Sequence, residues 1–231
     1  TGILHAIPQL NTPGSSHDGT IDPETGETIE NPADYIVAPP QSTGDVGNSY
    51  LDPDSETTWT FLRHVVGQVQ DITQGEYFHV GGDETHKMHQ RYGGDKVANF
   101  LKEASAMIHE IGVTPIGWNE WAPGGNVPAS GDVMQLWNGN EAGFTNGIKA
   151  SGGKVIYSQA SRAYFPQKAG PGVWGATWAC GGACGLDRFY NYDPQALMNL
   201  PDENMLGVEG AMWNEHVRSM QDFFFPAFPR A

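Results

Sequence analysis

Short apolar runs alternate with amphipathic helical segments along most of this 231-residue chain. This alternation is typical of a parallel sheet whose strands are joined by helices. Six runs have the composition of strands, namely residues 3–10, 77–80, 113–118, 133–137, 155–157 and 206–213. We therefore predict the α/β fold class.

Two segments carry apolar residues at helical spacing. One covers DKVANFLKEASAMIHEI and stops at Gly112. Its predicted inward face consists of Val97, Phe100, Leu101, Ala104, Met107, Ile108 and Ile111. The other begins near Ser55 and ends before Gln74. Its predicted inward face consists of Trp59, Leu62, Val65, Val66, Val69 and Ile72.

Residues 11–54 have almost no periodicity and are rich in Asp, Pro, Gly, Ser and Thr, which indicates a long loop after a strand. The loop is either plain surface or one wall of a substrate cleft. No repeat, low-complexity tract or interdomain linker is visible. Residues 1–231 are therefore predicted to form one domain.

The composition favours a neutral partner. A formal charge of −15 would repel phosphate backbones and anionic lipids, so nucleic acid and membrane partners are not expected. We find no apolar run long enough to span a bilayer, and residues 1–10 lack the features of a signal peptide. The seven tryptophans suit a sugar-binding site, because aromatic rings stack on sugars.

The chain has two cysteines, Cys180 and Cys184, which are too few for a disulfide framework or a four-cysteine zinc site. The glycines of CGGAC permit a tight loop, so a local disulfide is one interpretation. Two free thiols are the other, and both stay open.

The segment EYFHVGGDETH carries the strongest chemical pattern. An apolar strand ends in two glycines, which let the backbone bend, and then presents Asp83 and Glu84. A carboxylate pair can keep one member protonated while the other stays ionised, which is what glycoside cleavage requires. One alternative is a solvated turn. Another is a metal site, although the HExxH spacing is absent. Its ligands would be His79, Asp83, His86 and His89.

The segment HVGGDE resembles the HxGGDE signature of the family 20 glycoside hydrolases. Further segments are similar to family motifs in the family's order, namely IGWNE, VMQLW, SQASRAY, TWAC and MWNEHVR. The resemblance spans nearly the whole chain. It implies a (β/α)8 TIM barrel of which this chain holds about six of eight strands, the third to the eighth. We therefore expect a fragment, with the missing strands supplied by the rest of the polypeptide.

The resemblance implies a retaining β-N-acetylhexosaminidase acting on glycans or chito-oligosaccharides, with no cofactor and no metal. Glu84 would be the general acid and base, and Asp83 with Tyr164 would aim the substrate's acetamide oxygen at the anomeric carbon. An oxazolinium intermediate follows. Terminal GlcNAc or GalNAc would be released. Because glycans lie mostly outside cells, a secreted or cell-surface location is expected.

The resemblance also implies the residues that hold the sugar. Trp118, Trp137 and Trp213 would box it, and Trp178 would lie near the leaving group. Glu215 would accept hydrogen bonds from sugar hydroxyls. His79 is either a substrate-binding residue or a core histidine with a backbone partner. Asp193 is interpreted as structural.

The chain also departs from the family pattern. The family's sugar-gripping Arg has no counterpart here, and Gln9, Asn11 and Ser15 replace two acids and a His. Pro166 replaces the acid that follows the substrate tyrosine, so recognition of the sugar's O6 must differ. These departures leave two alternatives, a lacto-N-biosidase-type release of disaccharides and a non-catalytic carbohydrate-binding relative. An incomplete barrel would also expose part of the Phe cluster at residues 223–228.

Overall fold

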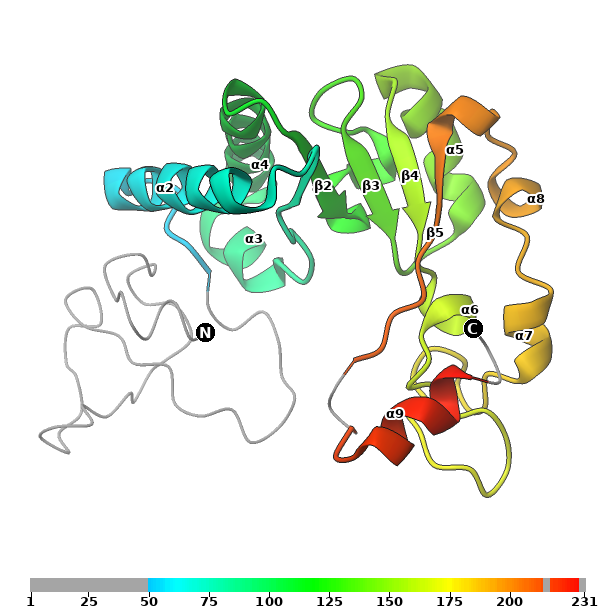
Figure 1. Cartoon of the computed structure of the whole chain (residues 1–231). Coiled ribbons are helices and arrows are strands. Elements are labelled where there is room, and N and C mark those ends of the chain that lie inside the picture. The colour runs from blue at the N-terminus through cyan, green and yellow to red at the C-terminus, as the bar shows by residue number, and fades with distance from the viewer. Residues whose placement is uncertain (1–49, 214–216, 229–231) are drawn as a thin grey trace, which may run out of the picture. The chain divides into compact units, whose positions relative to one another are not determined.

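The computed structural model describes residues 50–213 and 217–228 (Figure 1). They belong to two compact units, of which the first ends at Pro115 and the second begins at Ile116. The strand predicted at residues 3–10 and nearly all of the loop predicted at residues 11–54 lie outside the described residues. The prediction of one domain over residues 1–231 stays a prediction.

The first unit is built on two long helices, both expected from their periodicity. Its elements are α2 (Glu56–Thr73), β1 (Tyr77–His79), α3 (His86–Tyr92) and α4 (Gly94–Glu110). Val66 of α2 is buried in one cluster with Met107 and Ile108 of α4. The Trp59 and Phe100 rings lie 5.1 Å apart between the same helices. The apolar faces of α2 and α4 therefore pack on each other.

The predicted inward face of α2 is wrong at its C-terminal end. Val69 is 37% exposed and Ile72 is 82% exposed. The apolar cluster shared with α4 takes in Leu62 and Val66 but neither of these later residues. Periodicity identifies the apolar stripe of a helix, but it does not tell how far the packing partner extends along that stripe.

Five strands form one sheet in the order β1-β2-β3-β4-β5. The last four are β2 (Thr114–Trp118), β3 (Val133–Leu136), β4 (Lys154–Tyr157) and β5 (Met205–Val208), and they run side by side (Figure 1). β3 pairs in parallel with both β2 and β4, and β4 pairs in parallel with β5. All four residues of β3 are buried, as in a sheet covered on both faces. The predicted α/β class is confirmed.

The last strand is shorter than predicted. It ends at Val208, so Trp213 lies beyond it. The following segment pairs instead with the chain around Tyr164. Ala211 donates its N–H to the Ala163 carbonyl, and Phe165 donates to the Ala211 carbonyl at 2.9 Å. Glu209 still donates its N–H to the carbonyl of Tyr157 in β4 at 2.9 Å, and the regular strand pairing gives way to this irregular pairing only beyond it. Composition cannot reveal such a change.

The core of the second unit lies between the sheet and α5 (Glu141–Ser151). It contains Met134, Leu136, Val155 and Tyr157 from the strands and Ile148 from α5, all fully buried. The short elements around it are η2 (Asn119–Trp121), η3 (Pro123–Gly125), α6 (Ala160–Ala163), α7 (Leu186–Tyr190), α8 (Pro194–Met198) and η4 (Asp202–Asn204).

Two features of the remaining helices bear on the sequence predictions. The Asp193 carboxylate accepts the Ala196 N–H at 3.0 Å and so caps α8, which is the structural role expected of it. The last helix, α9 (Met220–Ala227), leaves Phe223 38% exposed and Phe225 60% exposed, in line with the expected exposure of this cluster. Among the described helices, none has the length and apolar character needed to cross a bilayer.

Close packing of α5 on η3 depends on glycine. A Cβ atom added to Gly147 would lie 2.0 Å from the Gly124 carbonyl oxygen, whereas one added to Gly143 would meet nothing within 4 Å. Both glycines lie in α5. We predict that Gly147→Ala lowers the free energy of unfolding by about 1–3 kcal/mol through overpacking.

Gly143→Ala is the matched control, since alanine in an unobstructed helix position raises the free energy of unfolding by up to about 1 kcal/mol. Urea denaturation of both variants measures the difference. Equal effects of the two substitutions would contradict the packing of α5 on η3.

Candidate active site

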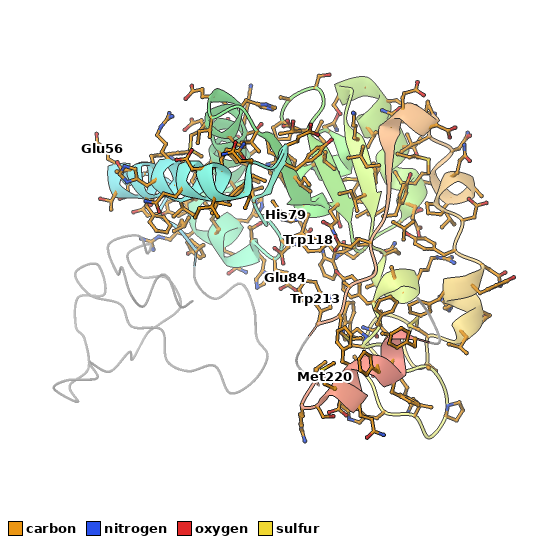
Figure 2. All side chains as sticks on the ribbon, in the orientation of Figure 1. Glu56, His79, Glu84, Trp118, Trp213 and Met220 are labelled. Carbon is orange, nitrogen blue, oxygen red and sulfur yellow. A yellow bond between two sulfur atoms is a disulfide. The ribbon has the colours of Figure 1, made fainter. Side chains whose placement is uncertain are left out.

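The carboxylate segment directly follows β1 and has an unusual backbone. Gly81 and Gly82 have φ angles of 74° and 88°, and Glu84 has a φ of 52°. The left-handed region costs a non-glycine residue energy, and such residues cluster at functional sites. The Gly81 N–H donates to His79 Nδ1 at 3.0 Å, which ties the turn to the strand end. Asp83 is exposed and Glu84 is half-buried. Figure 2 labels His79 and Glu84 on this segment.

The described residues give no basis for the alternative metal site. Across residues 50–213 and 217–228, no three or more His, Cys, Asp or Glu side chains gather closely enough to hold a metal ion. His79, Asp83, His86 and His89 therefore do not form the ligand set considered above. His79 uses its Nδ1 atom locally, since it accepts the Gly81 N–H.

In the second unit, the five aromatic residues singled out from the sequence form one cluster. Tyr164 is buried at its centre, and its ring is stacked on that of Trp137, with 6.5 Å between centroids. Trp178 and Trp213 meet the Tyr164 ring edge-on at 6.1 Å and 5.6 Å. Trp118 lies 6.0 Å from Trp213, and both are labelled in Figure 2. We call these five residues the aromatic cluster.

Parts of the aromatic cluster are open to a ligand. Trp178 is 58% exposed and Trp213 is 40% exposed, whereas Trp118 and Trp137 are half-buried. Exposed indole faces beside a phenol can pack against the C–H face of a sugar ring, and a hydroxyl can donate to its polar groups. Glu215, predicted to accept from sugar hydroxyls, lies outside the described residues.

Two polar residues that the sequence reasoning did not assign hold Trp137. The Trp137 indole N–H donates to both carboxylate oxygens of Glu120, at 2.9 Å and 3.2 Å. The Trp137 backbone N–H donates to Asn119 Oδ1 at 3.1 Å. The pairing of the strands could have indicated these contacts. Trp118 is paired with Gln135 in the parallel sheet, so the residues that follow each of them leave the sheet at the same edge.

A third unassigned residue connects the strands. Gln135 is buried, and its Nε2 atom donates to Ser158 Oγ and to Glu209 Oε1, both at 2.8 Å. The three residues lie in or just after β3, β4 and β5. Gln135 therefore fixes the carboxyl ends of these strands relative to one another. It lies two residues before Trp137 in the sequence.

The loop that carries Trp178 is tied down at several points. Cys180 and Cys184 form a disulfide with Cα atoms 5.6 Å apart, which decides the question that the sequence left open. The Cys184 N–H donates to the Lys168 carbonyl at 2.7 Å. With its amide oriented to suit its neighbours, Gln167 accepts the Trp178 indole N–H at 3.2 Å and donates to the Ala176 carbonyl. The loop is thus bound to the segment that follows Tyr164.

Several known proteins with similar sequences are named as hexosaminidases. A beta-N-acetylhexosaminidase of Cellulomonas fimi is 31% identical over 98% of this chain and 44% of its own length. The beta-hexosaminidase subunit A1 of Dictyostelium discoideum is 24% identical over 99% of the chain and 42% of its own length. This chain therefore spans less than half the length of these curated relatives.

Solved structures agree with the sequence matches. The GH20 beta-N-acetylhexosaminidase of Streptomyces coelicolor superimposes with a TM-score of 0.74 at 30% identity, over 85% of this chain and 40% of that one. The Streptomyces plicatus beta-hexosaminidase in complex with the product GlcNAc gives a TM-score of 0.73 at 28% identity, over 85% and 39%. These neighbours are TIM-barrel enzymes, so the predicted barrel class, present in part, is confirmed.

The profile described as "Glycosyl hydrolase family 20, catalytic domain" matches residues 3–231. That range covers both compact units and all of the predicted motifs. This chain belongs to glycosyl hydrolase family 20.

Proposed function

We propose that the chain carries the catalytic groups of a retaining β-N-acetylhexosaminidase that releases terminal N-acetylhexosamine from glycans. The observation that carries the proposal is the aromatic cluster around the buried Tyr164, with exposed tryptophan faces beside it. Relatives named as hexosaminidases, one of them solved with GlcNAc, support this substrate class.

In the proposed reaction the substrate supplies its own nucleophile. The carbonyl oxygen of the 2-acetamido group attacks the anomeric carbon while Glu84 donates a proton to the leaving oxygen. The glycosidic bond breaks and an oxazolinium ring closes. Glu84 then accepts a proton from the water that reopens the ring, so the anomeric configuration is retained. No covalent bond to the enzyme forms, and no cofactor takes part.

Asp83 and Tyr164 are proposed to prepare the acetamide. A carboxylate at Asp83 accepts the acetamide N–H and favours the positive charge that develops on the ring nitrogen. The Tyr164 hydroxyl donates to the acetamide oxygen and aims it at the anomeric carbon. The left-handed backbone of Glu84 supports the assignment of a functional role to the adjacent carboxylates.

The tryptophans and Glu215 are proposed to bind the sugar. Trp118, Trp137 and Trp213 face its C–H surfaces, and Trp178 lies toward the leaving group. Glu215 accepts hydrogen bonds from sugar hydroxyls. His79 is proposed to orient the carboxylate segment through its bond with the Gly81 N–H. Rings that exclude water also strengthen the nearby charged hydrogen bonds.

We also propose that the protein acts outside the cell, and the disulfide supports this location. Disulfides persist in oxidising compartments, and the Cys180–Cys184 bond matches a secreted or cell-surface enzyme that meets extracellular glycans. The formal charge of −15 favours neutral glycans over anionic ones.

The first of three predictions from the proposed function tests its chemistry. Because Glu84→Gln keeps the shape of the side chain but cannot transfer its proton, kcat should fall at least about hundredfold. Hydrolysis of an aryl N-acetylglucosaminide by the full-length gene product measures this. Glu103→Gln, at an exposed position of α4, is the matched control and should retain activity.

Two outcomes would count against this assignment. A kcat of Glu84→Gln within tenfold of the parent would remove Glu84 as the acid. Tight binding of a thiazoline analogue of the intermediate with no turnover by the parent would instead indicate the non-catalytic relative.

The second prediction concerns Glu120, which accepts the indole N–H of Trp137. Glu120→Ala frees the indole to rotate, so KM should rise about tenfold, as expected when a charge-assisted hydrogen bond is lost. Glu120→Gln keeps one acceptor and should have a smaller effect. Glu203→Ala, at an exposed site in η4, is the control. Unchanged KM and tryptophan fluorescence in Glu120→Ala would refute the positioning role.

The third prediction concerns the disulfide. Replacing Cys180 and Cys184 together by Ser removes a cross-link that closes a short loop, which lowers the free energy of unfolding by about 2 kcal/mol. The Trp178 loop should then exchange its amide hydrogens faster, and KM should rise more than kcat falls. Reduction of the parent protein should reproduce both changes. Equal hydrogen exchange in residues 177–184 before and after reduction would show that the disulfide does not hold the loop.

A further inference from the structure

Tyr164 directly follows α6, a helix of four residues that comes soon after β4 (Figure 1). A single turn forms few hydrogen bonds of its own, so its position depends on contacts with the rest of the fold. The Ala160 N–H donates to the Trp137 carbonyl at 2.8 Å, and Gln159 Nε2 donates to the Gly139 carbonyl at 2.8 Å. These bonds hold the start of α6.

The side chain of Arg162, in the same turn, reaches two other segments of the second unit. Its Nε atom lies 3.8 Å from Oε1 of Glu141, which is in the first turn of α5. Its guanidinium lies over the ring of Tyr192, 5.8 Å from the centroid, which is within the range of a cation–π contact. Tyr192 comes between α7 and α8. Arg162 therefore connects α6 with α5 and with the chain that precedes α8.

The ion pair between Arg162 and Glu141 is largely shielded from water. The Arg162 side chain is 26% exposed and the Glu141 side chain is 16% exposed. The Arg63–Glu110 pair of the first unit, by contrast, leaves 54% and 62% of its side chains exposed. Exposed ion pairs contribute little to stability, whereas shielded charges attract each other more strongly and are costly to separate. The Arg162–Glu141 pair is therefore suited to holding α6 in place.

The surroundings of Tyr192 agree with a contact that excludes water. Burial raises the pKa of the Tyr192 hydroxyl, and the charges of Glu141 and Arg162 act on this pKa in opposite directions. Both charged side chains are therefore close to the phenol. The phenol stays neutral, and the face of a neutral aromatic ring attracts a guanidinium.

The position of α6 determines the position of Tyr164. Only Ala163 separates Arg162 from Tyr164, and it is buried. The Ala163 carbonyl also accepts the Ala211 N–H at 3.0 Å. So short a connection leaves Tyr164 little freedom to move independently of α6. A shift of α6 would displace the Tyr164 ring from Trp137, on which it is stacked.

We propose that Arg162 is a positioning residue for Tyr164 in the reaction described above. Its contacts with Glu141 and Tyr192 hold α6 so that the Tyr164 hydroxyl keeps its direction toward the acetamide oxygen. A displacement of about 1 Å is enough to slow a reaction strongly, because the reacting groups lose their alignment. The inference rests on the proposed function, to which it adds this residue.

The sugar-binding tryptophans should be affected less than Tyr164. Glu120 holds the indole of Trp137, and Gln167 holds that of Trp178. Neither bond involves α6. Loss of Arg162 should therefore lower kcat more than it raises KM.

The test measures kcat and KM of the full-length gene product on an aryl N-acetylglucosaminide. Arg162→Gln should lower kcat about tenfold and change KM by less than about threefold. Arg162→Lys keeps the charge and should recover part of the loss. Arg188→Gln, the same substitution at an exposed position of α7, is the matched control and should retain the parent kcat.

A double-mutant cycle separates positioning of Tyr164 from a general effect on the structure. If Arg162 acts through the Tyr164 hydroxyl, Arg162→Gln should lower kcat less than about threefold in a Tyr164→Phe background. The same tenfold loss in both backgrounds would overturn the proposal. So would a parent-like kcat in Arg162→Gln, or a loss confined to KM.

A further variant covers the case in which Arg162→Gln does not fold, since Glu141 would then be shielded from water without its partner. Replacing Glu141 and Arg162 together by Gln removes both charges and leaves none unpaired. The double variant should lose kcat to the same extent as expected for Arg162→Gln. A double variant that folds and keeps the parent kcat would contradict the role of the ion pair.

Failure of the proposed function gives a different result, because the parent then hydrolyses no aryl glycoside. Amide hydrogen exchange still tests whether Arg162 holds the segment in that case. Residues 160–165 should exchange faster in Arg162→Gln than in the parent and in Arg188→Gln. Equal exchange in all three proteins would overturn the inference.

Discussion

The parallel register of β2, β3 and β4 is the constraint on which the second unit depends. Gln135 in β3 is paired with Trp118 on one side and with Ile156 on the other. Parallel strands deliver their next residues to one edge of the sheet, so side chains distant in the sequence emerge together there. Trp137 thus meets Asn119 and Glu120, and a slip of one residue would turn these side chains to the opposite face.

Hydrogen bonds then convert this shared edge into a defined surface. Glu120 fixes the Trp137 indole, Gln167 fixes that of Trp178, and Gln135 links three strands beneath them. The indole N–H of a buried Trp usually finds a hydrogen-bond partner, and here that partner also fixes the direction of each ring. The Cys180–Cys184 disulfide likewise restrains the loop that carries Trp178, which contains no strand. The orientation of the Trp137 and Trp178 rings therefore depends on polar groups that need not touch a bound sugar.

The two units place the proposed functional groups in different ways. In the first, local chain geometry is enough, since two glycines and one left-handed glutamate place the carboxylates directly after a short strand. In the second, the aromatic residues come from five separate segments and meet through tertiary packing. Local strain and distributed packing are both ways to hold side chains in functional positions, and each has an energetic cost that the rest of the fold must offset.

The sequence by itself determined the α/β class, the positions of the described strands, the helices α2 and α4, and the family. These follow from period, strand composition and a long motif, all of which are local properties of the chain. Only the tertiary structure decided that Ile72 faces outward, that the last strand stops at Val208 and that the cysteines pair. It also supplied the partners of Trp137 and the ion pair of Arg162 with Glu141. The physical reason is that burial, pairing and side-chain contacts depend on groups far apart in the chain, whose meeting no local pattern encodes.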